Sequence, residues 1–263
     1  MNPSSAPPIS APPRIVEAYK RGWPRLAIHA MILAKLRGRF FSVRAQGLDR
    51  LRAALDDEPG GVLFLANHSC WWDLFLADLL NEHIPVDGYG MMEHFNMVRF
   101  RFFRRIGAFS IDRTDPRSVR ASLDYAVGRL RGPRAGVWIF PQGRMVGNDI
   151  RPLGFQEGLR ALVGRAGRIR MVATALRYEF LQDERPEAFV RFGAPSWVDR
   201  ADRASVLSTW EGRLTDELDA LKADVTAQDA GQFTEVLAGR SSVSDRYARL
   251  RAIIAGPTPG APA

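Results

Sequence analysis

The residues Val62 to Ala66 (V-L-F-L-A) form a short apolar run that follows a pair of glycines. A run of this length between turn residues is typical of a strand that is buried on both faces. A second apolar stretch, Leu74 to Leu80, has the character of a helix that begins soon afterwards. Three polar residues lie between the two, namely Asn67, His68 and Asp73. They occupy a corner where a strand ends and a helix begins, which is where open α/β sheets bind ligands.

Short apolar runs and helical segments continue to alternate along the middle of the chain. Strands are expected over residues 107–113, 136–140, 170–178 and 188–192, and helices over 48–55, 91–105, 116–131 and 155–165. This order predicts an α/β fold in which a mixed, largely parallel sheet is flanked by helices. Two further helices are expected near the C-terminus, a regular amphipathic one over 203–222 and a short one over 241–254.

The ends of the chain differ in composition from its middle. Residues 1–13 and 256–263 are rich in proline and are expected to be disordered tails. Residues 14–46 carry many basic side chains around an apolar core that is shorter than the ~20 residues needed to span a bilayer. We expect an amphipathic helix pair here, broken near Pro24, which lies in the interface of an acidic membrane or caps the domain. Both roles are compatible. The domain itself is expected over 47–255, with C-terminal helices in 201–255.

The chain carries a formal charge of +8 and has a pI of about 10.3, which favours anionic partners. Nucleic acid is one such partner. No RNP-like or helix-turn-helix pattern accompanies the basic segments, however, so we expect the protein not to bind nucleic acid. The absence of G-x-S-x-G argues against an α/β-hydrolase, and the absence of a P-loop argues against nucleotide hydrolysis. The histidines show no recognisable metal-ligand spacing, so no metal is expected.

His68 and Asp73 are five positions apart, so on one ideal helix their side chains would diverge by about 140°. If His68 precedes the helix and Asp73 lies in its first turn, the carboxylate can fold back onto the imidazole. Such an aspartate fixes the tautomer and offsets the charge of the protonated ring, so the other nitrogen can act as a general base. Cys70, the only cysteine, offers a thiol nucleophile as an alternative, although a lone cysteine is more often buried and inert.

The stretch N-H-S-C-W-W-D, from Asn67 to Asp73, resembles the N-H-x-x-x-x-D block of the glycerolipid acyltransferases. This is the PlsC-like lysophospholipid acyltransferase family, which makes phosphatidic acid. Three further blocks follow in the family's order. Gly107–Arg113 resembles the second, F-P-Q-G-R at Phe140–Arg144 is similar to the third, F-P-E-G-T-R, and Met171–Leu176 takes the place of the fourth. With F-G-A-P at Phe192–Pro195, the resemblance covers roughly residues 62–195.

The resemblance implies an O-acyltransferase of the 1-acylglycerol-3-phosphate type that serves phospholipid biosynthesis or lipid remodelling without a cofactor. His68 would take the proton from an acceptor hydroxyl as the hydroxyl attacks the thioester of acyl-CoA or acyl-carrier protein. Asp73 would orient the ring, and backbone N–H groups at the start of the next helix would stabilise the oxyanion. Arg113 would hold the phosphate of a lysophospholipid-like acceptor. The acceptor site would be shaped by Pro141, Gln142, Gly143 and Arg144. Such an enzyme would be peripheral or monotopic on the cytoplasmic face of the cell membrane.

The third and fourth blocks depart from the family pattern. The family's glutamate is replaced by Gln142, its threonine by Arg144 and its arginine by Met145, and the fourth block lacks its proline. These changes leave the His–Asp pair intact and bear on the acceptor, so a glycolipid or an amino-acid lipid is an alternative to lysophosphatidic acid. A non-catalytic lipid- or membrane-binding protein on the same fold is a further alternative.

Overall fold

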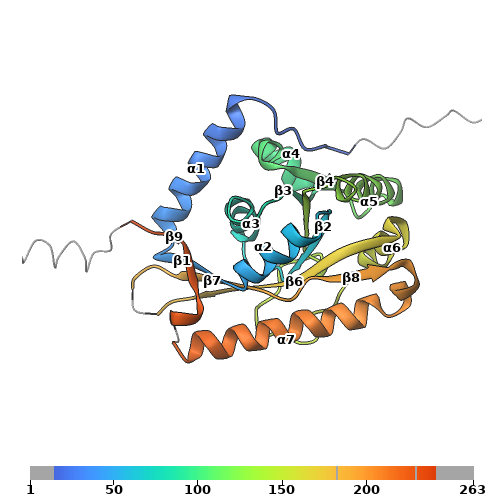
Figure 1. Ribbon diagram of the computed structural model, residues 1–263. Coiled ribbons are helices and arrows are strands. Elements are labelled where there is room, and N and C mark those ends of the chain that lie inside the picture. Colours follow the sequence, from blue (N-terminus) through green and yellow to red (C-terminus); the bar gives the residue numbers. More distant parts are fainter. Residues whose placement is uncertain (1–14, 182, 229, 241–263) are drawn as a thin grey trace, which may run out of the picture.

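The computed structural model describes residues 15–181, 183–228 and 230–240 (Figure 1). Its α-helices are α1 (Trp23–Arg39), α2 (Leu48–Asp57), α3 (Asp73–Asn81), α4 (His94–Arg99), α5 (Pro116–Leu130), α6 (Gly158–Ala166) and α7 (Val206–Thr226). Its strands are β1 (Ser42–Gln46), β2 (Val62–Ala66), β3 (Asp87–Glu93), β4 (Ala108–Ile111), β5 (Ala135–Ile139), β6 (Arg168–Glu179), β7 (Glu187–Phe192), β8 (Ser196–Asp199) and β9 (Thr234–Ala238). The 3-10 helices are η1 (Arg101–Ile106), η2 (Arg200–Ala204) and η3 (Ala230–Gln232). The expected tails and the helix expected over 241–254 lie outside the described residues.

The strands of the described chain form one sheet with the order β4-β3-β5-β2-β6-β7-β1-β9, and β8 pairs with β6 beside this path. Strands β4, β3, β5, β2 and β6 run parallel to their neighbours, whereas β7 and β8 run antiparallel to β6. Helices cover both faces (Figure 1). The predicted fold class, a mixed and largely parallel sheet flanked by helices, is confirmed. Because parallel strands end at the same edge, the residues that follow β2, β4 and β5 meet there.

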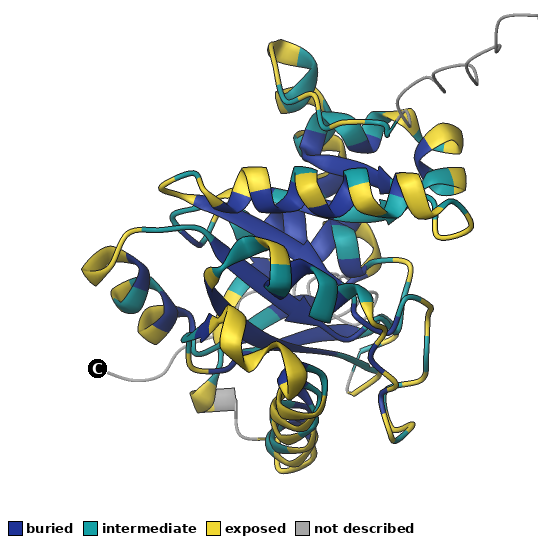
Figure 2. Ribbon diagram, turned by 90° about the vertical axis from the view of Figure 1, so that its right-hand side faces the viewer, coloured by how far each residue is buried: buried dark blue, intermediate teal, exposed yellow. Residues whose placement is uncertain are grey.

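Strand β2 lies near the middle of this sheet and is buried at every position. Leu63 and Leu65 point to the core under α5, α6 and α7, while Phe64 points to the core under α2 and α3. Figure 2 shows the strands of the sheet buried between helices whose outer sides are exposed. The unbroken apolar run of β2 therefore reflects burial on both faces.

Two expectations about local structure were wrong. The helix expected over 91–105 is instead the end of β3 followed by α4 and η1, because the first of these residues pair with β4. The helix pair expected within 14–46 is a single helix, α1, which begins at Trp23 with Pro24 in its first turn. Before it, Val16 exchanges two hydrogen bonds with Ser110 of β4, donating to the side chain and accepting from the backbone. The sheet already begins at β1, within the same segment.

Helix α1 has one buried side and one exposed side. Ile32 and Leu36 are fully buried where α1 packs on α3 and η1. Trp23 and Leu26, in contrast, are 78% and 69% exposed. Among the residues that the structure describes, no helix combines the length and apolar character needed to cross a bilayer. Helix α1 thus caps the domain and also presents large apolar side chains to its surroundings.

Candidate active site

His68 and Asp73 are brought into contact at the corner that follows β2. His68 lies in the loop after the strand, and Asp73 is the first residue of α3. The intervening residues turn the chain back, so that His68 Nδ1 lies 2.7 Å from Asp73 Oδ2. Asp73 is 0% exposed, whereas the His68 side chain remains partly accessible. A buried carboxylate on Nδ1 leaves Nε2 as the ring nitrogen that can accept a proton.

The Asp73 carboxylate is held by further donors. Its Oδ2 accepts hydrogen bonds from the backbone N–H groups of Ser69 at 2.9 Å and Cys70 at 3.0 Å. Its Oδ1 accepts a hydrogen bond of 2.5 Å from the Tyr178 hydroxyl at the end of β6. Burial, followed by the neighbouring Asp73 charge, raises the pKa of Tyr178 well above its ordinary value, so this hydroxyl stays protonated and donates. The carboxylate is therefore fixed in position before any substrate binds.

His68 is fixed by the loop that follows β5. Its backbone N–H donates to Gln142 Oε1 at 2.7 Å, and its carbonyl accepts from the N–H of Val146 at 2.7 Å. Its ring stacks on Phe140 with 4.6 Å between the ring centroids. Gln142 is buried, and its carbonyl oxygen makes a bond that a carboxylate oxygen could also make. The replacement of the family's glutamate thus keeps this support of His68 and removes a negative charge.

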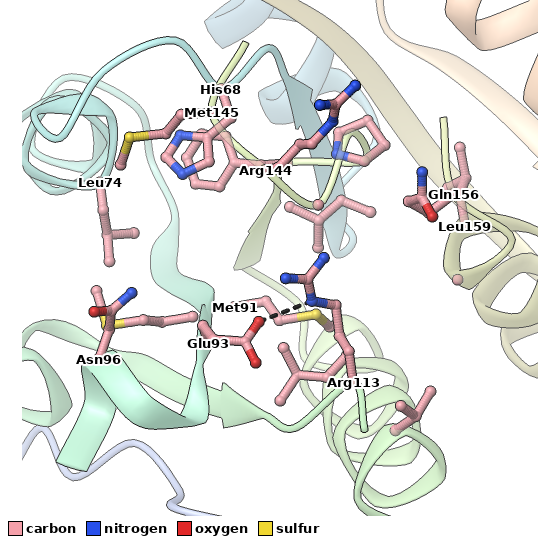
Figure 3. Close-up of a pocket in the computed structure, with 18 of the residues that line it drawn as sticks. His68, Leu74, Met91, Glu93, Asn96, Arg113, Arg144, Met145, Gln156 and Leu159 are labelled. Atoms are coloured by element: carbon pink, nitrogen blue, oxygen red, sulfur yellow. Dashed lines mark hydrogen bonds and ion pairs between the residues drawn. The ribbon is translucent and has the colours of Figure 1, made fainter. Parts of the chain in front are cut away.

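Arg113 lies against Gly143, in the turn from Pro141 to Arg144. Its Nε donates to Glu93 Oε2 at 2.8 Å, the contact drawn as a dashed line in Figure 3. Gly143 has a φ of +67°, and a Cβ there would lie 3.0 Å from Arg113 Nη1, so both the backbone and the close approach favour glycine. Arg144 is exposed and has no partner among the described residues. The structure therefore gathers the residues of the first three sequence blocks at one edge of the sheet.

The chain matches a known protein family. The family model described as Acyltransferase matches residues 42–179, which is more than half of the chain. The chain belongs to the acyltransferase family. This is the family of PlsC-like acyltransferases, so the resemblance drawn from the sequence blocks is confirmed. A search of curated proteins finds no match to the chain.

The acyltransferase has a cavity of about 540 Å³ beside His68. Predicted site residues that line it are His68, Arg113, Pro141, Gly143 and Arg144. Asp73 and Gln142 do not line it. They hold His68 through hydrogen bonds to its ring and to its backbone N–H. Most of the remaining wall is apolar and comes from α3, β3, α5 and α6, with Leu74, Met91, Leu123, Leu159 and Leu162 among its members. The cavity thus combines a few polar side chains, His68 among them, with a largely apolar wall, and its volume is that of a small-molecule site.

The backbone N–H groups of the loop before α3 are already engaged. Those of Ser69 and Cys70 donate to Asp73, and those of Trp71 and Trp72 face the Cys70 sulfur. The oxyanion role expected of N–H groups at the start of the next helix stays a prediction. Burial raises the pKa of the Cys70 thiol, which disfavours the thiolate that a nucleophile requires.

Asn67, the first residue of the sequence block, has a structural role. Its side-chain oxygen accepts from the N–H of Leu176 at 2.7 Å, and its side-chain nitrogen donates to the Leu176 carbonyl at 2.9 Å. These two bonds continue the β2–β6 ladder beyond Ala66, which is paired with Thr174. An amide can serve as donor and acceptor at once, which explains why asparagine suits this position. Asn67 thus fixes the backbone directly before His68.

Proposed function

We propose that this acyltransferase moves a fatty acyl group from acyl-CoA or acyl-carrier protein to a hydroxyl of a lysophospholipid-like acceptor. The supporting observation is that His68 lines the cavity while its Nδ1 is bound to buried Asp73. His68 Nε2 takes the hydroxyl proton as the hydroxyl oxygen attacks the thioester carbonyl. The tetrahedral intermediate then loses the thiolate as the C–S bond breaks, and the imidazolium returns the proton to sulfur. This sequence needs no covalent acyl-enzyme and no cofactor.

The experiment that tests this proposal incubates the purified protein with a labelled acyl thioester and a panel of lysophospholipids, glycolipids and amino-acid lipids. Thioesters of CoA and of acyl-carrier protein are compared as donors. We expect label to move to at least one acceptor with the wild type and not with His68→Ala. If wild-type protein transfers to none of them and yet binds the lipids, the non-catalytic alternative is favoured.

The apolar interior of the cavity is proposed to hold the acyl chain, which predicts an effect of chain length. Leu123→Trp on α5 should fill part of that interior, since Leu123 is nearly fully buried and lines the cavity. Losing the space for two methylene groups at ~0.8 kcal/mol each lowers kcat/KM about 10-fold. We expect this loss for a 16-carbon donor and a smaller loss for an 8-carbon donor. Arg120→Trp, on the exposed side of the same helix, is the control. An equal loss for both donors would contradict the assignment.

The acceptor is a second question, because the Arg113 charge is partly offset by Glu93. This ion pair favours, as a second candidate, a glycolipid or amino-acid lipid acceptor over lysophosphatidic acid. Glu93→Gln should release Arg113 and lower KM for a phosphate-bearing acceptor by up to about 5-fold, the effect of one exposed ion pair. Glu157→Gln removes the other carboxylate of the cavity lining and is the control. If Glu93→Gln changes KM equally for charged and uncharged acceptors, Arg113 does not bind phosphate.

We also propose that the enzyme is peripheral on the cytoplasmic face of the cell membrane, with the exposed side of α1 in contact with lipid. Deletion of the N-terminal segment is a poor test, because Ile32, Leu36 and Phe40 belong to the core. Replacing Trp23 and Leu26 by serine removes only exposed apolar surface. Vesicle binding should fall at least about 10-fold, as expected when two large apolar side chains no longer enter the interface. Unchanged binding in a sedimentation assay would show that another surface contacts the membrane.

A further inference from the structure

A second cavity, of about 340 Å³, lies between η1 and the N-terminal part of the chain, apart from the one beside His68. Its lining consists of Tyr19, Ile28, Arg101, Phe102, Arg104 and Arg105. Half of these residues are arginines, and none of them belongs to the proposed catalytic or acceptor site. The sequence showed a basic rim here but not the cavity, since Tyr19 and Ile28 are distant along the chain. Ile28 reaches it through the packing of α1 on η1, and Tyr19 through a backbone hydrogen bond of 2.8 Å to the Arg104 carbonyl.

Arg104 and Arg105 are held in place without being neutralised. Arg104 Nε donates to the Glu17 carbonyl at 2.9 Å, and Arg105 Nη1 donates to the Arg21 carbonyl at 3.1 Å. The Arg105 guanidinium also lies 4.5 Å from the centroid of the Tyr19 ring. Carbonyls and aromatic rings are uncharged, so these contacts orient the guanidinium groups and leave their charge. In the part of the chain that is described, no carboxylate forms an ion pair with any of the three arginines. Three positive charges therefore converge on one cavity.

Large exposed apolar side chains lie on the elements that adjoin η1. Helix α1 carries Trp23 and Leu26, and α4 carries Phe95 and Val98, which are 70% and 54% exposed. Both helices contact η1, and Figure 1 shows α4 beside the N-terminal end of α1. Arginines next to exposed tryptophan, phenylalanine and leucine are typical of a surface that binds anionic lipid, where apolar groups enter the acyl region and cations meet phosphates.

Helix η1 also separates this cavity from the catalytic one. Phe102 lines the arginine cavity and Phe103 lines the cavity beside His68, and their rings stack with 4.4 Å between centroids. Trp71, which lines the catalytic cavity and is 40% exposed, contacts Phe100 edge to face. A lipid held against η1 would therefore place the bilayer beside the wall of the catalytic cavity. An acyl chain or lipid acceptor could then pass between the two without crossing water.

We propose that the cavity lined by Arg101, Arg104 and Arg105 binds the phosphate of an anionic membrane phospholipid and docks the α4–η1 edge on the bilayer. The guanidinium groups contact phosphate oxygens, for which arginine has the matching geometry. Apolar side chains of α1 and α4 enter the lipid around the head group. This inference rests on the proposed membrane association and is independent of acyl transfer, because binding is measured without an acyl donor.

The test measures sedimentation of the full chain with vesicles of phosphatidylcholine alone or with phosphatidylglycerol added. Wild type should bind the anionic vesicles more tightly. Arg101→Gln with Arg105→Gln should weaken that binding roughly 30-fold, the effect of two basic residues at a lipid surface. The charge-matched control is Arg200→Gln with Arg203→Gln, in η2, which packs on α6 and α7 and should change binding less than about 2-fold.

A further variant separates a built site from general attraction between charges. Ile28→Trp fills the cavity and leaves every arginine in place, so it should weaken binding to anionic vesicles while circular dichroism shows a retained fold. In a parallel arm, excess inorganic phosphate competes with the anionic vesicles for the protein. It should displace less protein from them than an excess of lipid vesicles does. The proposal is overturned if Ile28→Trp binds like wild type, if the two glutamine pairs weaken binding equally, or if free phosphate competes as well as lipid. If wild type binds no vesicles, both this site and the membrane association fail, whatever the transfer assay shows.

Discussion

His68→Ala is expected to lower kcat for acyl transfer about 10²- to 10⁴-fold, the usual contribution of a positioned general base. The substitution removes the ring whose Nδ1 is fixed by Asp73 and whose Nε2 is left to accept the proton of the hydroxyl. The fold should be retained, because the His68 side chain is partly exposed and packs mainly on Phe140. The effect is measured by steady-state transfer from a labelled thioester, with thermal unfolding as the check on folding.

Two comparisons make this result specific to the base. His83→Ala alters a histidine that does not line the cavity and should leave kcat within about 2-fold of wild type. Free imidazole should restore part of the lost turnover in His68→Ala, because alanine leaves space beside Asp73 for the added ring. Near-normal turnover in a folded His68→Ala protein would exclude His68 as the base and leave the chemistry to another group.

The sequence could predict an element when the residues of that element alone show how it is buried. Strand β2 matched its expected bounds, because a strand buried on both faces is apolar at every position. Strand β3 was missed because Gly88 and Gly90 weaken the strand pattern. Both glycines face side chains of α3, because a Cβ at Gly90 would meet Leu74 and one at Gly88 would meet Asn81. The reason for the glycines lies in the packing of another element.

The same distinction applies to the site. His68 and Asp73 are five positions apart, so their contact depends on one loop and could be predicted from spacing. Tyr178 and Glu93 were not predicted, because their roles depend on strand order. Tyr178 meets Asp73 because β6 lies beside β2, and Glu93 meets Arg113 because β3 lies beside β4. In the sequence Tyr178 is only the end of a strand, and nothing in that pattern marks its hydroxyl.

Asp73→Asn is the second substitution with a large expected effect, and it should reduce both stability and turnover. The buried carboxylate accepts from His68, Tyr178 and two backbone N–H groups, whereas an amide offers one accepting oxygen and places N–H groups against some of these donors. Each donor left unpaired costs about 1–3 kcal/mol, so the free energy of unfolding should fall by about 2–4 kcal/mol. Loss of the anion also permits the wrong His68 tautomer and leaves the imidazolium unstabilised, so kcat should fall about 10²- to 10⁴-fold.

Tyr178→Phe separates these two effects, because it removes one hydrogen bond to Asp73 Oδ1 and leaves the bond between Oδ2 and His68 intact. We expect it to lower the free energy of unfolding by about 1–3 kcal/mol and to lower kcat less than about 10-fold. Urea unfolding and steady-state transfer on the same preparations measure both quantities. If Tyr178→Phe reduces kcat as strongly as Asp73→Asn, the carboxylate acts through the whole hydrogen-bond network. If instead Asp73→Asn loses stability but keeps its turnover, Asp73 is structural and His68 acts as a base without it.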